Sequence, residues 1–331
     1  MKPRRLMAAV ILAVIAAATL LAPFVAPHDP HEQYADYPYA PPMRPHIVHE
    51  DGTWSAPFVY PVQLVDRLSV AYVERRAAPM PASAAWRRSL ERTAPQPIFF
   101  LGTDALGRDL LSRLLFGARA SLGIAAAATV GALLIGTLIG AIAGYARGLF
   151  DDLAMRVAEV ILVLPALYVV LALRASLPLV LEPWEVFLGV AAVLSIVGWP
   201  LVARGVRGIV VVESRLAYAD AARACGASGA RVLFRHVLPA TTGFIGTQAA
   251  LLVPAFAIAE ATLSFAGFGF AEPTPSWGTM LQEAANVRTL GEYPWLLAPA
   301  AAIALVSWAM HALVGADREA VLLMRNAELR T

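Results

Sequence analysis

Few residues in this chain of 331 residues have the types and spacing that chemistry needs. Lysine occurs once, at Lys2, and cysteine once, at Cys225. A Walker A loop requires a lysine directly after a glycine, and Schiff-base catalysis requires a lysine inside the chain. A single cysteine can form neither an internal disulfide nor a cysteine-ligated metal site. The sequence therefore excludes P-loop ATP hydrolysis and catalysis by an internal lysine.

One serine and one histidine suggest a nucleophile with its base. Residues 226–229, GASG, are similar to the nucleophile motif of rhomboid proteases, and His311 lies in an apolar segment. That chemistry needs both side chains within hydrogen-bonding reach in a site without water. Ser228 instead lies in an arginine-rich loop, where capping a helix is the simpler interpretation. An intramembrane serine protease is the weakest alternative.

Ionisable residues inside apolar segments are the signature of ion pathways. Glu159, Glu260 and His311 have this placement, and an ion-coupled secondary transporter is therefore the second alternative. The three residues lie at scattered depths, however, and no duplicated repeat is visible.

Two His-x-x-His pairs, His28/His31 and His46/His49, have a spacing that could suit a metal. Histidines at i and i+3 in a proline-rich chain lack a fixed frame for a metal ion. We therefore expect solvated loop histidines, and predict neither a metal site nor a cofactor.

The composition indicates an integral membrane protein. Hydrophobic residues make up 59% of the chain, charged residues only 15%, and mean hydropathy is +0.63. A soluble domain has about a quarter charged residues. Because spanning helices need about 20 apolar residues, we predict an all-α, polytopic bundle of six transmembrane helices. The predicted spans are Leu6–Ala26, Ala120–Gly144, Leu153–Leu173, Val186–Ala203, Gly243–Gly267 and Pro294–Ala316.

The first span could also be a cleaved signal peptide, because MKPRR resembles a positive leader region. Its apolar run is long for a leader, and Pro27 follows the expected cleavage site, so an uncleaved helix is preferred.

Arginines in the short loops predict the orientation. Lys2, Arg4 and Arg5 precede the first span, and residues 27–42 contain no lysine or arginine. Six spans from a cytoplasmic N-terminus place residues 145–152 and 204–242 inside. The second of these loops carries six arginines (204, 207, 215, 223, 231 and 235). Both termini are therefore expected in the cytoplasm.

Four regions follow from these spans: an N-terminal helix at 1–27, an extracytoplasmic insert at 28–100, a core at 101–318 and a cytoplasmic tail at 319–331. Twelve of the 24 prolines fall between Pro27 and Pro97, which favours an extended, mostly irregular insert. In the second span, Gly136, Gly140 and Gly144 form a small-xxx-small stripe. Such stripes pack helices closely, so we expect internal packing in preference to a subunit seam.

The most informative loop reads YADAARACGASGARVLFRHVLP, residues 218–239. Alanine and arginine predict a helix from Leu216 to Cys225, and Gly226 can adopt positive φ at its end. Ser228 can cap a second short helix through Phe234, and Pro239 marks re-entry towards the membrane. The simpler alternative is a basic loop attracted to anionic lipid.

This loop resembles the EAA signature of binding-protein-dependent ABC importer permeases. The matching positions are Asp220, Ala221, Ala222, Gly226, His236, Leu238 and Pro239, and Tyr218 belongs to the same predicted coupling loop. Three further stretches resemble the C-type subunit of the oligopeptide/dipeptide/nickel family: LGTDALGRDLLSRLLFGARASL (101–122), EATLSFAGFGF (260–270) and PTPSWGTML (273–281). Their motif positions are Gly102, Thr103, Asp104, Gly107, Arg108, Asp109, Glu260, Pro275, Ser276, Trp277 and Gly278.

The resemblance covers about 1–27 and 98–318, with two departures. Residues 28–97 exceed the family's usual connection, and GADRE at 315–319 matches loosely.

The resemblance implies a non-catalytic subunit of the bacterial inner membrane. Its loop would insert a coupling helix into a separate ATPase subunit, and ATP-driven closure would switch two homologous permeases between inward- and outward-facing states. A solute-binding protein would deliver the substrate, with short peptides as the default and nickel as an alternative.

Overall fold

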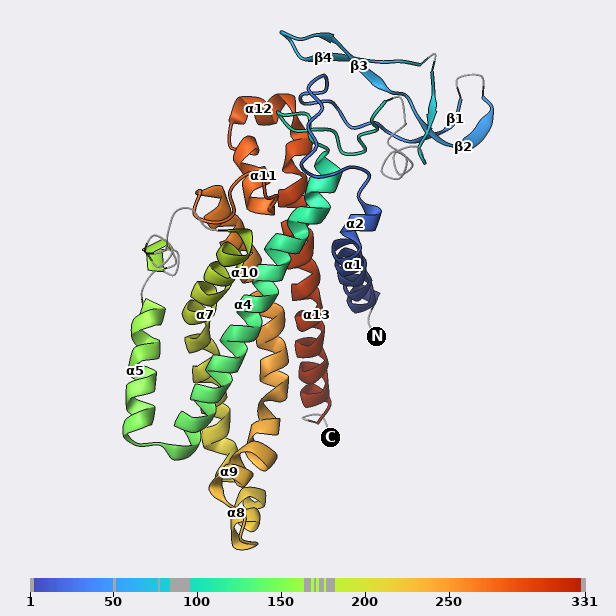
Figure 1. Ribbon diagram of the computed structural model, residues 1–331. Coiled ribbons are helices and arrows are strands. Elements are labelled where there is room, and N and C mark those ends of the chain that lie inside the picture. Colours follow the sequence, from blue (N-terminus) through green and yellow to red (C-terminus); the bar gives the residue numbers. More distant parts are fainter. Residues whose placement is uncertain are drawn as a thin grey trace. The chain divides into compact units, whose positions relative to one another are not determined.

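The computed structural model describes residues 3–49, 52–76, 78–83, 96–163, 168–169, 171–172, 176 and 182–328. Within these ranges five helices are long and apolar enough to cross a membrane. They correspond to α1 (Pro3–Leu20), α4 (Leu110–Ala146), α7 (Pro183–Glu213), α10 (Thr242–Phe265) and α13 (Ala298–Glu328) (Figure 1). A helical membrane protein is thus confirmed, with five of the six predicted spans.

The predicted span Leu153–Leu173 is only partly described. Its first part belongs to α5, Leu149–Val163, which has 15 residues. Residues 164–167, 170 and 173 of that span lie outside the described residues. Six spans therefore remain a prediction.

The chain divides into two compact units. The first unit comprises Met1–Ala9, Leu122–Glu260 and Val306–Thr331, and the second comprises Val10–Ser121 and Ala261–Leu305.

In the first unit, α4 packs against α7 through the glycine stripe. A Cβ on Gly140 would lie 2.4 Å from the carbonyl oxygen of Ala203, and one on Gly136 would lie 2.6 Å from Val202 Cβ. A Cβ on Gly144 would lie 2.9 Å from Arg207 O. Only glycine allows the two backbones to approach this closely, as small-residue helix interfaces do. The prediction of internal packing is confirmed.

Helix α5 also packs on α7. Ala158 of α5 forms a buried cluster with Trp199 and Ala203 of α7. At the first turn of α5, Asp151 is buried and makes a bidentate ion pair with Arg207, with Nη2 2.6 Å from Oδ2. The fork geometry of arginine fixes both the distance and the orientation of such a pair.

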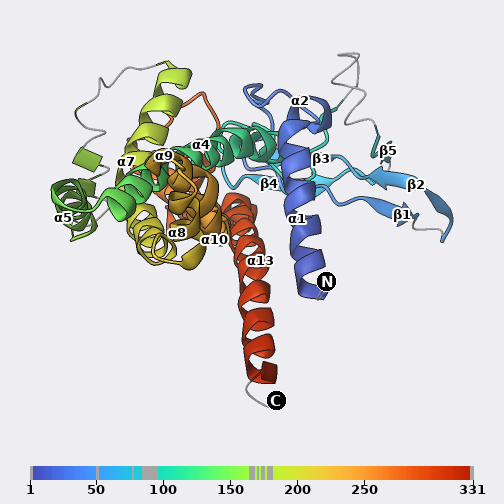
Figure 2. The same ribbon diagram turned by 90° about the horizontal axis from the view of Figure 1, so that it is seen from below.

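In the second unit, part of the insert folds into two small antiparallel sheets. Strand β2 (Trp54–Val59) lies between β1 (His46–Val48) and β5 (Met80–Pro81), as Figure 2 shows, and β3 (Val62–Asp66) pairs with β4 (Ala71–Glu74). The strands border a buried core, and the expectation of a mostly irregular segment is wrong for the described residues between 46 and 81. The core residues are Ala40, Met43, Val59, Val62, Ala82, Ile98 and Phe99.

The high proline content led to the wrong expectation because prolines can still accept backbone hydrogen bonds through their carbonyl groups. Pro57 O accepts from Ala82 N at 2.8 Å, and Pro61 O accepts from Arg75 N at 2.7 Å. Proline removes a donor but keeps its acceptor, so it is tolerated where no backbone N–H is needed.

The histidines of the insert are not simple solvated loop residues. His28 is buried beside Phe99, with Nδ1 3.5 Å from Asp109 Oδ2. His46 and His49 stack on Phe58, with ring centroids 5.8 and 4.1 Å away. The expectation therefore holds only for His31, which is exposed. Across the described ranges, no cluster of three or more histidine, cysteine or acidic side chains could hold a metal.

Candidate functional site

The loop after α7 folds into two short helices joined at a glycine, as predicted. Helix α8 covers Ala217–Ala224, α9 covers Gly229–Val232, and Gly226 between them has φ +81°. Ser228 caps α9, since its Oγ accepts from Arg231 N at 3.4 Å. Both views place α8 and α9 beside the end of α7 and the start of α10 (Figures 1 and 2). This segment, residues 217–232, is called the α8–α9 loop below.

Helix α8 turns one face inward and presents the other to its surroundings. Ala219 is fully buried and Ala222 is half-buried. Tyr218 is 40% exposed, and the residues Asp220, Ala221, Ala224 and Cys225 are exposed. The exposed residues are mainly small, but they include the larger side chains of Tyr218, Asp220 and Arg223.

Hydrogen bonds fix α8 to the end of α7. Tyr218 Oη donates to Glu213 Oε2 at 2.6 Å, and Arg223 Nη2 donates to Ser214 O at 3.0 Å. Burial and the hydrogen bond to Glu213 raise the pKa of Tyr218 to about 12. The phenol therefore stays protonated and keeps donating at any physiological pH.

The chain re-enters the bundle through an irregular helical turn. Leu233–Val237 is a π-helical turn and Leu238–Thr241 is a 3₁₀ turn, after which α10 begins. Pro239 is exposed, as is His236, while Leu238 is half-buried. Because proline cannot donate to the carbonyl four residues earlier, the helical hydrogen-bond ladder must shift near Pro239.

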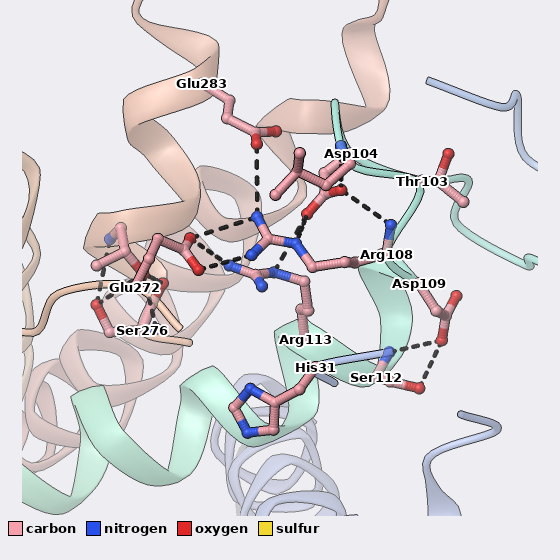
Figure 3. Close-up of polar contacts among 12 residues, drawn as sticks. His31, Thr103, Asp104, Arg108, Asp109, Ser112, Arg113, Glu272, Ser276 and Glu283 are labelled. Atoms are coloured by element: carbon pink, nitrogen blue, oxygen red, sulfur yellow. Dashed lines mark hydrogen bonds and ion pairs between the residues drawn. The ribbon is translucent and has the colours of Figure 1, made fainter. Parts of the chain in front are cut away.

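In the second unit, the motif around residue 104 builds a charged cluster, which we define as Asp104, Arg108, Arg113, Glu272 and Glu283 (Figure 3). Arg108 Nε lies 2.6 Å from Asp104 Oδ2, and its Nη1 lies 2.6 Å from Glu272 Oε2. Arg113 Nη2 lies 2.7 Å from Glu272 Oε1. Glu283 Oε1 completes the cluster at 3.7 Å from Arg108 Nη2.

The charged cluster has three carboxyl groups and two guanidinium groups. Burial and the negative charge of Asp104 raise the pKa of Glu283 to about 7, although Arg108 opposes the shift. Burial alone would raise the pKa of Glu272, but the charges of Arg113 and Arg108 hold it below its usual range. Glu283 therefore ionises at a higher pH than Glu272, because burial raises the pKa of Glu283 more than the arginines lower it.

The other residues of the same motif anchor the insert. Thr103 Oγ1 donates to Tyr37 O at 2.5 Å and accepts from Ala40 N at 2.7 Å. Asp109 Oδ2 accepts from Ser112 Oγ at 2.5 Å. Two motif glycines have positive φ: Gly102 at +79° and Gly107 at +72°. A Cβ on Gly107 would lie 2.1 Å from Tyr34 O, so no other residue fits.

The motif PTPSWG starts α11 (Trp277–Ala284) and ties it to α4. Ser276 Oγ accepts from Thr279 N at 3.2 Å and caps α11. Trp277 is buried, and its Nε1 donates to Leu114 O at 3.1 Å. Gly278 permits close approach, because its Cβ would lie 2.4 Å from Ala261 O; Pro275 is also buried.

The structure thus joins motif residue Arg108 to Glu272, directly before PTPSWG, and ties Trp277 of that motif to Leu114. It also adds Arg113, Glu272 and Glu283, which are not among the motif positions. Arg113 lies within the quoted stretch GRDLLSR, and Glu272 directly precedes PTPSWG, so both were visible as charged residues flanking motif positions. Nothing in the sequence around Glu283 marks it as a member of the charged cluster.

The residues that suggested the two weaker alternatives lie in separate places, and two of them have local partners. Glu260 is fully buried in α10, Glu159 is exposed on α5, and His311 Nδ1 lies 2.7 Å from Ser307 O of its own helix. Ser228 is the cap of α9.

Comparison with known proteins gives two family matches. Residues 136–316 match the family described as binding-protein-dependent transport system inner membrane component. Residues 2–42 match the N-terminal transmembrane domain of oligopeptide transport permease C.

Individual relatives are permease proteins of peptide transport systems, in agreement with the two family matches. The oligopeptide transport system permease protein OppC of Bacillus subtilis is 36% identical over 69% of this chain and 72% of the relative. The dipeptide transport system permease protein DppC of the same organism is 37% identical over 69% and 70%. The di/tripeptide transport system permease protein DppC of Pseudomonas aeruginosa is 34% identical over 83% and 73%. With five membrane-length helices and a family match over more than half of its length, this multi-pass chain belongs to the binding-protein-dependent transport system inner membrane components, as an ABC importer permease subunit.

Proposed function

We propose that this chain forms, with a second homologous permease, the membrane pathway of an ATP-driven importer of short peptides. Separate ATPase subunits supply the energy, and an extracytoplasmic solute-binding protein supplies the substrate. The chain itself performs no catalysis. It lies in the bacterial inner membrane with both termini in the cytoplasm.

The observation that carries the proposal is the architecture of the α8–α9 loop. A rigidly anchored short helix with an exposed face suits insertion into a groove on another protein. Small side chains at Ala221 and Ala224 permit close approach of a partner surface. The exposed Asp220 contributes about 1 kcal/mol or less through a surface ion pair, so shape governs docking more than charge does.

Cys225 makes this docking directly measurable. It is the sole cysteine of the sequence and is exposed at the end of α8. In purified complex, we expect bound ATPase to slow maleimide labelling of Cys225. The matched control is a Cys225→Ser chain with a new cysteine at exposed Ser55 in the insert, whose labelling rate should not change. Equal labelling of Cys225 with and without ATPase contradicts docking at α8.

The peptide substrate is proposed from the relatives, whose names describe oligopeptide, dipeptide and di/tripeptide transport. Proteoliposomes holding the whole complex should accumulate a labelled dipeptide or tripeptide when ATP and the binding protein are present. Unlabelled peptide should compete, and Ni²⁺ should not. Accumulation that persists without ATP and stops with an uncoupler would instead indicate ion-coupled transport.

A further inference from the structure

Tyr145 lies between the two short helices of the α8–α9 loop, although it belongs to α4. It is the second-to-last residue of α4, and its ring centroid lies 5.7 Å from Arg223 Cζ of α8. A Cβ on Gly229 would lie 3.5 Å from Tyr145 Cε1 and Oη, which places the start of α9 against the same side chain. No motif position identified from the sequence includes Tyr145.

Arg223 joins three elements through one guanidinium group. Nη1 donates to Asp220 Oδ1 at 2.7 Å within α8, and Nη2 donates to Ser214 O at 3.0 Å, at the end of α7. The planar group also lies over the ring of Tyr145 on α4. A planar guanidinium can use its edges for hydrogen bonds and its face for an aromatic ring at once, which a lysine ammonium cannot do.

We propose that Arg223 and Tyr145 are positioning residues that make α8, α9 and the adjoining ends of α4 and α7 move as one body. The inference rests on the proposed docking of the ATPase at α8. Helix α8 follows α7 directly in the sequence and is hydrogen-bonded to its end through Tyr218 and Arg223, and it continues through Gly226 into α9. The end of α4 is more than 70 residues away in the sequence, so it follows α8 only through side-chain contacts.

The pair of contacts therefore determines whether a push on α8 reaches α4. Helix α4 carries the glycine stripe that packs on α7 in the same unit. A body that includes both helix ends would transmit the ATPase movement to two helices of the pathway together. Without the contacts, α8 would keep the hydrogen bond between Tyr218 and Glu213 but would no longer be held to α4, and part of the movement would be lost.

Transport per ATP hydrolysed separates this role from a merely structural one. The experiment uses the complete complex in proteoliposomes, with Tyr145→Ala, Arg223→Gln and the double variant. We expect ATPase binding and ATP hydrolysis to persist, while transport per ATP falls between about twofold and thirtyfold, the effect expected of residues that carry coupling. The double variant should lose no more than the stronger single variant, because both substitutions break one contact.

Two control variants fix the interpretation. Arg215→Gln removes the same charge from an exposed arginine of the same region and should leave transport per ATP unchanged. Tyr145→Phe keeps the ring but removes the hydroxyl that hydrogen-bonds to Arg223, so it should lose less coupling than Tyr145→Ala. If Tyr145→Ala does not yield folded protein, Arg223→Gln against Arg215→Gln still decides the question.

A distance measurement tests the rigid body itself. Nitroxide labels at native Cys225 and at a new cysteine replacing exposed Ala146 should give the same dipolar broadening in the resting and ATP-trapped states. In Arg223→Gln the broadening should differ between the two states.

Unchanged transport per ATP in both single variants, or labels that separate in the wild type, overturns the proposal. If the proposed function itself is wrong, the result is different: bound ATPase would fail to slow maleimide labelling of Cys225 even in the wild-type chain.

Discussion

At the scale of single residues, backbone geometry decides what the α8–α9 loop can tolerate. Gly226 has φ +81°, yet no atom lies within 4 Å of where its Cβ would be. A substitution there is opposed by backbone conformation and not by a steric clash. The loop could therefore lose its geometry while the rest of the molecule folds normally.

We expect Gly226→Val to abolish uptake with little loss of membrane-inserted protein and to weaken ATPase co-purification. The left-handed conformation costs a non-glycine residue about 1–2 kcal/mol, enough to tilt α8 but small beside the stability of a helical bundle. Uptake assays and co-purification measure the two effects.

Gly148 provides the matched control, because it also has positive φ, +69°, and open space around its Cβ position. Gly148→Val should carry a similar backbone cost without disturbing α8. Asp220→Ala should do less than Gly226→Val. If the loop only binds anionic lipid, neutralising Arg215, Arg223 and Arg231 should matter and Gly226→Val should not; normal transport by Gly226→Val contradicts the coupling role.

The second residue-scale prediction concerns Glu283. Its pKa is raised from about 4.5 to about 7, so its protonated form stabilises the fold fully below pH 4.5, and this contribution is lost as the pH rises through 7. Glu283→Gln should therefore remove part of the fall in thermal unfolding midpoint between pH 5 and 8. The contribution is at most about 3 kcal/mol, from 1.36 kcal/mol per pKa unit.

The control is Glu292→Gln, which removes an exposed carboxyl of the same unit. Its unfolding midpoint should keep the pH dependence of the wild type. Identical pH profiles for Glu283→Gln and wild type would show that Glu283 is already ionised at pH 5.

At the scale of elements, sequence patterns predicted what depends on local chemistry. The two helices of the α8–α9 loop followed from alanine content, a glycine and a capping serine, each of which acts within a few residues. The sheets of the insert were missed, because their core joins residues as distant as Ala40 and Phe99. The charged cluster was missed in part for the same reason, since Arg108 and Glu272 are 164 residues apart.

Packing of α4 on α7 gives the prediction at this scale. We expect Gly140→Ala to destabilise the protein by about 1–3 kcal/mol, the usual cost of overpacking, because the new Cβ would lie 2.4 Å from Ala203 O. Gly208→Ala in α7 is the matched control, since nothing lies within 4 Å of its Cβ position. There alanine should be neutral or stabilising by up to about 1 kcal/mol, through helix propensity.

Thermal unfolding in detergent, with tryptophan fluorescence as the signal, compares the two variants. Equal midpoints for Gly140→Ala and Gly208→Ala would mean that α4 and α7 do not rely on close backbone contact.

At the scale of the whole molecule, composition predicts the class of protein but leaves the number of spans open. Long apolar runs predict five helices that the structure contains. The remaining predicted span, Leu153–Leu173, begins with Arg156 and Glu159 and has the weakest apolar run. Its existence decides whether the two termini lie on the same side, which a test of sidedness can measure.

We predict that both termini are cytoplasmic, because arginines of short loops stay on the cytoplasmic side. Reporter domains fused after Ser55 or Thr274 should be extracytoplasmic, and those fused after Ser214 or Arg325 should be cytoplasmic. The reporter after Ser214 is the internal reference, because the loop it tests carries six arginines. With only five spans, Lys2 and Arg325 would lie on opposite sides of the membrane. That result would exclude a sixth span. At least one of two predictions would then be wrong: that the α8–α9 loop is cytoplasmic, or that the insert is extracytoplasmic.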